Sequence, residues 1–250
     1  MQGNTILITG GGSGIGRGLA EALHREGNQV VIAGRRRGLL EETAQANPGM
    51  RFLPLDVEDG EAIREFAALV TAEFPKLNVL INNAGIMRME KLLEQPEDLG
   101  DAEAMVRTNL LGPIRLTAAL LPVLKRQERA AILNVTSGLA FVPLALTPVY
   151  SATKAALHSY TCSLRYQLKD TAIEVLEVVP PYVQTDLMNG ADDPRAMPLK
   201  DYIAEAMELL KAEPTPAEIC VKNAQGLRFA ESRGRFEATF KGLNDAFAES

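Results

Sequence analysis

Six short apolar runs recur along the chain, and the stretches between them have a different period. The runs are mostly β-branched and nearly unbroken, as expected of strands buried on both faces. They occupy residues 6–8, 30–32, 52–55, 79–81, 132–135 and 175–179. The intervening segments space apolar residues three and four apart, which predicts helices at 15–25, 63–74, 102–126 and 149–168. This alternation predicts an α/β chain with a six-stranded, doubly wound parallel sheet of Rossmann type, in three layers αβα.

The chain length of 250 residues fits one large domain. We therefore expect residues 1–250 to form a single nucleotide-binding domain. Residues 186–214 are rich in proline and follow the sixth strand, beyond which ligands bind in such sheets. They are expected to form a substrate lid.

The C-terminal region, residues 215–250, is expected to be helical. Thr215 and Pro216 supply an N-cap and a proline at the first helical position, which predicts a helix start there. A final amphipathic helix is predicted from an apolar stripe. Its residues are Phe236, Phe240, Leu243 and Phe247.

Charge and cysteine content exclude several classes of protein. A formal net charge of −6 argues against a nucleic-acid-binding protein, and no apolar stretch reaches the roughly 18 residues of a membrane span. Cys162 and Cys220 have no second cysteine near either, which argues against a disulfide framework or a zinc pair. Without a signal peptide at its start, the chain is predicted to be cytoplasmic, with neither nucleic-acid nor membrane partners.

A glycine-rich loop follows the first strand. Residues 9–16 read TGGGSGIG, and the chain then becomes helical. Glycines let backbone N–H groups approach a pyrophosphate, which a helix N-terminus also favours. The GxGxxG spacing is absent, and no Gly-Lys-Ser/Thr of a Walker loop follows. We interpret the segment as a nucleotide-binding loop, the alternative being an ordinary strand-to-helix turn.

Three arginines follow the second strand. In dinucleotide-binding folds an acid at this place holds the adenosine ribose, whereas an arginine receives a 2′-phosphate. Here Gly34 leads into Arg35, Arg36 and Arg37, without an acid. Arg35 is expected to contact the phosphate, helped by Arg36 or Arg37. NADP(H) is favoured over NAD(H), and a solvated charge run is the alternative.

A serine, a tyrosine and a lysine are candidates for catalysis. Ser137 ends the fifth strand, and Tyr150 and Lys154 share one helix face four residues apart. A nearby ammonium and an oxidised nicotinamide ring are expected to lower the tyrosine pKa from about 10 toward neutral pH. Alone, the Tyr-x-x-x-Lys spacing is more often a surface pair. Its place after the glycine loop and Ser137 favours catalysis.

Together these motifs resemble the short-chain dehydrogenase/reductase family, in its compact single-domain type. Thr9, Gly10, Gly14 and Gly16 match the family's TGxxxGxG pattern, and residues 82–85 match its NNAG segment. The resemblance is continuous from about residue 5 to residue 185. The chain is also similar in overall style to the DltE-like oxidoreductases of bacteria.

The resemblance implies hydride transfer between a nicotinamide and a carbonyl or alcohol carbon. It implies that Tyr150 donates the proton in reduction, Ser137 holds the substrate oxygen, Lys154 binds the nicotinamide ribose and Asn109 positions a relay water. No metal is implied. The cofactor-binding residues expected from the motifs and the resemblance are Thr9, Gly10, Ser13, Gly14, Ile15, Gly16, Arg35, Arg36, Asp56, Val57, Asn83, Ala84, Gly85, Tyr150, Lys154, Val183 and Thr185.

The chain departs from the family at two places. Pro181 stands where the family has glycine, which predicts a stiffer pocket wall that Tyr182 enters. The family's Val-Asp-Gly-Gly-like final strand is not recognisable in residues 226–250, which puts the common tetramer in doubt. By resemblance, a homodimer on the helices at 102–126 and 149–168 is expected.

The substrate is expected to be a small hydrophobic or aromatic carbonyl compound or the matching alcohol. The residues expected to face it are Met87, Leu139, Phe141, Leu144, Tyr182 and Leu187 or Met188. The alternative role of these substrate-facing residues is packing in the core. His24 and His158 are expected to be structural. Two other functions stay open: a 3-ketoacyl thioester reductase and a non-catalytic NADP(H)-sensing protein.

Overall fold

A parallel sheet organises the computed structural model, which describes residues 2–94, 98–188 and 193–248. Within these residues the sheet has seven strands in the order β3-β2-β1-β4-β5-β6-β7. The strands are β1 (Thr5–Thr9), β2 (Gln29–Gly34), β3 (Arg51–Pro54), β4 (Leu77–Asn82), β5 (Ala130–Val135), β6 (Ile173–Val179) and β7 (Glu218–Cys220). The first six coincide with the six apolar runs, and the predicted doubly wound parallel sheet is confirmed.

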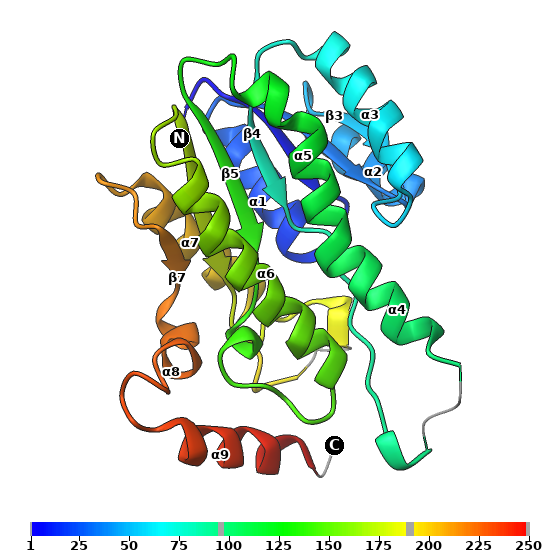
Figure 1. The fold of residues 1–250 in the computed structure, drawn as a ribbon. Helices are drawn as coiled ribbons and strands as arrows, with labels where there is room; N and C mark the ends of the chain where they lie inside the picture. Colours follow the sequence, from blue (N-terminus) through cyan, green and yellow to red (C-terminus); the bar gives the residue numbers. More distant parts are fainter. Residues whose placement is uncertain (1, 95–97, 189–192, 249–250) are drawn as a thin grey trace.

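Helices cover both faces of this sheet (Figure 1). They are α1 (Gly14–Arg25), α2 (Arg37–Ala46), α3 (Gly60–Glu73), α4 (Gly100–Val106), α5 (Gly112–Leu124), α6 (Pro148–Gln167), α7 (Leu199–Lys211), α8 (Gln225–Arg228) and α9 (Phe236–Ala248). One buried cluster joins the sheet to α1, α2 and α7, and a second joins it to α3, α5 and α6. The three-layer αβα arrangement is thus confirmed.

The alternation of side chains along the strands builds this two-faced core. In β1, Ile6 and Ile8 belong to the cluster under α1 and α7, whereas Leu7 belongs to the cluster under α3 and α5. All three are fully buried. Each such side chain contributes about 1.5–3 kcal/mol to folding through burial. The near-continuous apolar runs are therefore required by a sheet that is covered on both sides.

The seventh strand corrects two predictions. A helix start was expected at Thr215, and β7 lies there instead, paired in parallel with β6. Ile219 is fully buried, and the Glu177 N–H donates to the Ala217 carbonyl at 2.9 Å. The open edge of β6 offers a row of backbone partners, and pairing with it outweighs the local helix-start signal. The expectation of six strands is wrong for the same reason.

The segments after β6 divide into two parts. The expected lid, 186–214, includes residues 189–192, which lie outside the described residues. Its later part is α7, which packs into the helical layer through the fully buried Tyr202 and Ala206. The final amphipathic helix is confirmed as α9, which lies across the bottom of the view, apart from the helical layers (Figure 1).

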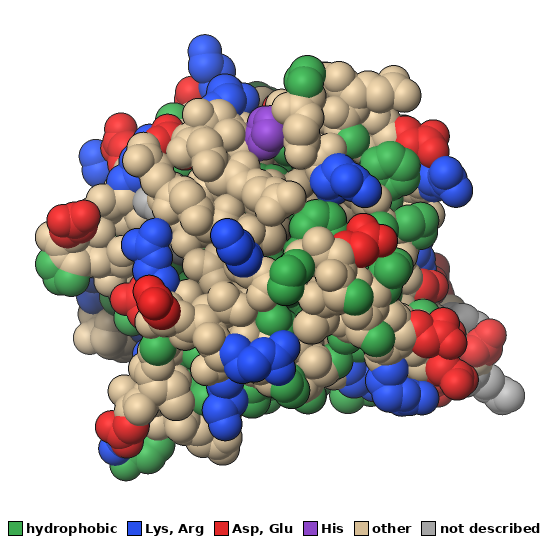
Figure 2. Space-filling model, turned by 90° about the horizontal axis from the view of Figure 1, so that it is seen from above, with side chains coloured by type: hydrophobic (Ala, Val, Ile, Leu, Met, Phe, Trp, Pro, Cys, Tyr) green, Lys and Arg blue, Asp and Glu red, His purple; other side chains and the backbone are tan. Residues whose placement is uncertain are grey.

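The described part of the chain has no helix that is both long enough and apolar enough to cross a membrane. On the face seen from above, acidic and basic side chains are interspersed (Figure 2). Charge on that face is therefore mixed rather than gathered by sign.

Candidate active site

Two adjoining cavities lie beyond the carboxyl ends of the strands. The larger, about 380 Å³, is lined by the loops that follow β1, β2 and β4. The smaller, about 90 Å³, is lined by the segments that follow β5 and β6, with Tyr150 of α6. Both are lined by Ile15, Met87, Thr185 and Leu187, so they form one continuous site. This is where open α/β sheets bind ligands.

The glycine loop brings backbone close to the larger cavity. Gly14 begins α1 with φ +51°, a left-handed conformation that favours glycine. A Cβ on Gly16 would lie 2.3 Å from the Gly10 carbonyl oxygen, so a larger residue does not fit. Thr9 joins the glycine loop to the loop after β4, because its hydroxyl accepts from the N–H groups of Asn83 and Ala84, at 3.1 Å each.

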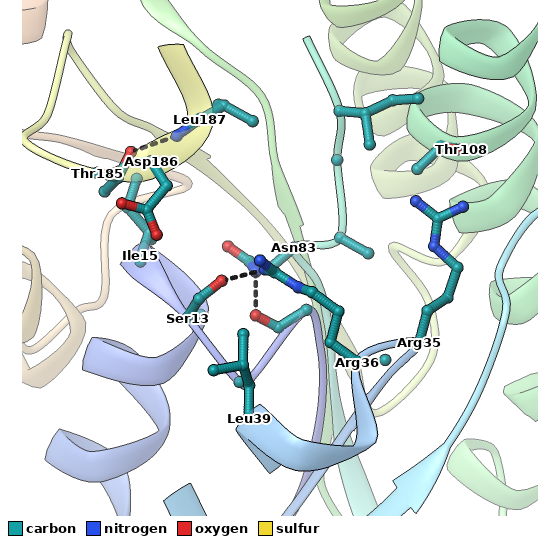
Figure 3. A pocket seen from close by; sticks show the side chains of 18 of the residues that line it. Ser13, Ile15, Arg35, Arg36, Leu39, Asn83, Thr108, Thr185, Asp186 and Leu187 are labelled. Atoms are coloured by element: carbon teal, nitrogen blue, oxygen red, sulfur yellow. Dashed lines mark hydrogen bonds between the residues drawn. The ribbon is translucent and has the colours of Figure 1, made fainter. Parts of the chain in front are cut away.

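Two of the three arginines border this cavity, as Figure 3 shows. Arg36 reaches across to Ser13 and donates to its hydroxyl at 2.6 Å. Arg35 points toward Thr108, and its guanidinium donates to Glu58 at 2.8 Å. Arg37 begins α2 and pairs with Glu41 of the same helix at 2.7 Å. Arg35 and Arg36 therefore both line the larger cavity, whereas Arg37 does not.

The expected cofactor-binding residues divide by position. Those lining the larger cavity are Gly10, Ser13, Gly14, Ile15, Gly16, Arg35, Arg36, Val57, Asn83, Ala84, Gly85 and Thr185. Val183 and Tyr150 line the smaller one. Thr9, Asp56 and Lys154 line neither, and the Asp56 carboxylate accepts from the Glu58 N–H at 3.0 Å. Asp56 therefore shapes the loop that presents Val57.

Several residues that line the larger cavity were not predicted from the sequence. Leu39 and Leu40 lie in α2, and Leu55 follows β3. The apolar spacing in residues 37–46 is the signal that could have indicated this helix. With the loop N–H groups at the start of α1 and the two arginines, these residues combine an apolar surface with phosphate donors. That donor set fits an elongated dinucleotide.

Tyr150 and Ser137 meet at the smaller cavity. Tyr150 is buried, and its phenol is hydrogen-bonded to Ser137. Burial raises the pKa of Tyr150 to about 12, an effect that the Ser137 hydrogen bond only partly offsets. The phenol therefore stays protonated at neutral pH in the chain by itself.

Lys154 lies one helical turn after Tyr150. Its ammonium lies over the Tyr150 ring, 5.6 Å from the centroid, and donates to the Val135 carbonyl at 2.8 Å. Burial lowers the pKa of Lys154 to about 8. The expected lowering of the Tyr150 pKa is not found here, because desolvation of the phenol dominates.

Asn109 connects the α4–α5 helix pair to the loop after β4. It lies in a π-helical turn, Arg107–Leu111, a feature often found at functional sites. Its side chain accepts from the Ile86 N–H and donates to the Ile86 carbonyl, both at 2.8 Å. A Cβ on Gly85 would lie 3.4 Å from Asn109 Oδ1 and 3.6 Å from Lys154 Nζ. Asn109 thus holds this loop close to Lys154.

The smaller cavity is mostly apolar. Five expected residues line it, namely Met87, Leu139, Leu144, Tyr182 and Leu187. Phe141 does not, because its ring packs edge-on against His158 at 4.7 Å between centroids. The side chain of Met188 lies outside the described part of the structure. Within that part, no charged residue lines this cavity.

The C-terminal helices form one wall of the smaller cavity, and this contact was not predicted from the sequence. Leu227 of α8 and Leu243 and Phe247 of α9 line the smaller cavity. The Phe247 ring packs edge-on against Tyr182, and the Tyr182 hydroxyl is 3.2 Å from the Asp193 carboxylate. The apolar stripe of the last helix was visible in the sequence. Its contact with a distant loop was not.

Known proteins resemble this chain both in sequence and in fold. Residues 4–196 match the short chain dehydrogenase family. An uncharacterised oxidoreductase, DltE, of Bacillus subtilis is 41% identical over 98% of both chains. The crystal structure of a short-chain dehydrogenase from Burkholderia cenocepacia in complex with NADP superposes with a TM-score of 0.83, at 27% identity over 97% of this chain and 98% of that one. A 3-ketoacyl-(acyl-carrier-protein) reductase from Brucella melitensis, complexed with NADH, gives 0.78, at 26% identity over 87% and 95%.

Proposed function

The chain belongs to the short-chain dehydrogenase family of oxidoreductases, and from this premise we propose an NADP(H)-dependent carbonyl reductase that also oxidises the matching alcohol. The observation that carries the proposal is the Tyr150–Ser137 pair at the smaller cavity, which adjoins the glycine-loop cavity. One cavity offers the donors that a dinucleotide needs. The other offers an apolar space beside a proton donor.

In the proposed reaction each residue has a separate task. When bound, the nicotinamide cofactor supplies or accepts the hydride. The Tyr150 phenol, which its raised pKa keeps protonated at neutral pH, gives its proton to the substrate oxygen in reduction. Ser137 holds the same oxygen as negative charge develops on it. Lys154 would hold the ribose of the nicotinamide, and Asn109 acts as a positioning residue that keeps Gly85 and Ile86 next to Lys154.

The preference for NADP(H) over NAD(H) is part of the proposal. Arg35 and Arg36 support it, because guanidinium groups pair well with phosphate. We expect the double variant Arg35→Ala/Arg36→Ala to bind NADPH at least about tenfold more weakly, since hydrogen bonds between charged groups contribute about 1.5–3 kcal/mol each. NADH binding is expected to change little. Dissociation constants from isothermal titration calorimetry measure both.

Arg37→Ala is the matched control for this experiment. Arg37 is adjacent in sequence, but its guanidinium pairs with Glu41 away from the cavity. Its substitution is expected to leave NADPH affinity unchanged. Equal affinities of the wild type for NADPH and NADH, or equal losses in the Arg37 and Arg35/Arg36 variants, would reject the preference.

The substrate proposed is small, uncharged and apolar. Support comes from the volume of the smaller cavity and its lining of leucines, prolines and aromatic rings. NADPH oxidation should be assayed with a panel of aldehydes and ketones and their carboxylate-bearing analogues. We expect kcat/KM to be at least about 100-fold lower for the carboxylates, because a buried charge without a partner costs several kcal/mol. Faster turnover of the carboxylates would contradict this.

A 3-ketoacyl thioester reductase is the second candidate, favoured by the likeness to the Brucella reductase. The same panel should include an acetoacetyl thioester beside an apolar ketone of similar size. Preferred turnover of the thioester would favour the second candidate. Binding of NADPH without turnover of any compound would instead favour a sensor.

We also propose a cytoplasmic homodimer of this single-domain chain. Val106 of α4 and Tyr166 of α6 are large apolar side chains exposed on the helices of the expected interface, which supports the dimer. Two unpaired cysteines suit a reducing compartment. Multi-angle light scattering is expected to give twice the chain mass of 27.1 kDa. The mass of one chain, or of four, at all concentrations would contradict it.

A further inference from the structure

A second group of reactive side chains lies on α6 and β6, and none of them lines the two cavities of the candidate active site. His158, Cys162 and Glu177 bring potential ligand atoms within 4.8 Å of one another. Cys162 is exposed, His158 is about one quarter exposed and Glu177 of β6 is fully buried. A structural role was expected for His158 from the sequence, and none of the three side chains takes part in the proposed reaction.

The buried carboxylate orients the imidazole. Glu177 receives two hydrogen bonds, one from the Thr136 hydroxyl at 2.7 Å and one at 2.8 Å from His158 Nδ1. A carboxylate only accepts, so the Nδ1 atom carries the proton. Nε2 is then the nitrogen that can bind a metal. A carboxylate bonded to the second nitrogen in this way is the usual partner of a metal-binding histidine.

The free imidazole nitrogen faces a thiol at a distance that suits a metal. His158 Nε2 and Cys162 Sγ are 3.8 Å apart. Zinc–nitrogen and zinc–sulfur bonds of about 2.1 and 2.3 Å at a tetrahedral angle place the two donors about 3.6 Å apart. Two ligands at positions i and i+4 of one helix are a recurring way to bind zinc.

The surroundings keep this arrangement fixed. The Phe141 ring packs edge-on against the imidazole, 4.7 Å between centroids, and the Arg228 guanidinium lies over the Phe141 ring, 4.4 Å from its centroid. Arg228 is held by a two-bond ion pair with Glu218, at 2.6 and 2.7 Å. The histidine is thus immobilised, and the nearby guanidinium is neutralised.

We propose that His158 Nε2 and Cys162 Sγ form a surface site for a soft divalent cation of the zinc class, with Glu177 as the orienting carboxylate and water completing the coordination. Binding forms metal–nitrogen and metal–sulfur bonds, and the thiol proton passes to solvent. The site goes beyond the proposed oxidoreductase function. It stands on α6 after Lys154, and its carboxylate holds Thr136, the neighbour of Ser137.

Cobalt is the probe for this site, because a cysteine thiolate bound to Co²⁺ gives a charge-transfer absorption. Untagged, metal-free protein with its thiols reduced should be titrated with Co²⁺. We expect one Co²⁺ per chain with this absorption, and its loss when Zn²⁺ is added. We also expect Zn²⁺ to slow alkylation of Cys162 by iodoacetamide, followed by mass spectrometry of the peptide.

The chain offers a matched control for each ligand, since it has two cysteines and two histidines. Cys162→Ser and His158→Gln are expected to weaken Co²⁺ binding at least tenfold. Cys220→Ser and His24→Gln should bind as the wild type does. Circular dichroism checks that all four fold. A titration without the charge-transfer absorption, or one that the Cys162 and His158 variants leave unchanged, overturns the proposal.

Discussion

Replacing Tyr150 by phenylalanine is expected to lower kcat for carbonyl reduction by about a thousandfold, a loss within the range for a positioned acid catalyst. The substitution removes one hydroxyl from a buried side chain and leaves the ring that lines the smaller cavity. The NADPH dissociation constant is expected to stay within about threefold, since the groups proposed to bind the cofactor phosphates lie in the other cavity. Steady-state kinetics and calorimetry measure the two quantities.

Tyr160→Phe is the control for this variant. Tyr160 is on the same helix, half-buried, and its hydroxyl bonds to Thr117 rather than facing either cavity. Its loss is expected to leave kcat unchanged. If Tyr150→Phe keeps more than about a tenth of wild-type turnover, proton donation by Tyr150 is refuted, because a general acid contributes at least about a hundredfold.

The strands could be predicted where the apolar pattern of the sequence matches the burial of the strand in the sheet. The runs that became β1 to β6 are apolar because both faces of those strands are covered, so the sequence carries the signal in each run. β7 has three residues, and it exists because the edge of β6 is open beside it. The residue types at 215–218 carry no information about the β6 strand, which pairs with β7 from some forty positions earlier in the chain.

In the site too, features set by the local sequence were predictable, and features set by contacts between distant segments were not. Glycine-loop residues, Ser137 and Tyr150 were predictable because each directly follows a strand or begins a helix at the same edge of the sheet. The wall formed by Leu243 and Phe247 depends on how α9 crosses that edge, which no motif encodes. The direction of the Tyr150 pKa shift also depends on burial. Spacing alone suggested the opposite direction.

Lys154 is expected to lower the free energy of unfolding of the wild type. Its ammonium group is almost fully buried, its one acceptor among the described residues is the Val135 carbonyl, and its pKa is lowered to about 8. We expect such a cost in stability at a group that serves a ligand. A variant without the charge therefore separates the two roles of the residue. It should lose activity and gain stability.

We expect Lys154→Met to be more stable than the wild type by about 2 kcal/mol at pH 7. A lysine pKa of about 10.4 in the unfolded chain and about 8 in the folded one corresponds to a folding penalty of about 3 kcal/mol, and the lost hydrogen bond returns about 1 kcal/mol of it. Below pH 8 both states are protonated, so the penalty is present in full. Between pH 8 and 10.4 the unfolded state binds more protons, so the wild type gains stability as pH rises.

The stability difference between the two proteins is therefore expected to change sign with pH. Near pH 10 most of the penalty has gone, and Lys154→Met should be equal to or less stable than the wild type, because it still lacks the bond to Val135. Urea unfolding at pH 7, 8.5 and 10 gives the free energies. Lys76→Met, at an exposed lysine, should show no such crossover. A Lys154→Met variant that is less stable at pH 7, or whose difference from the wild type is independent of pH, would show that the buried ammonium carries no folding penalty.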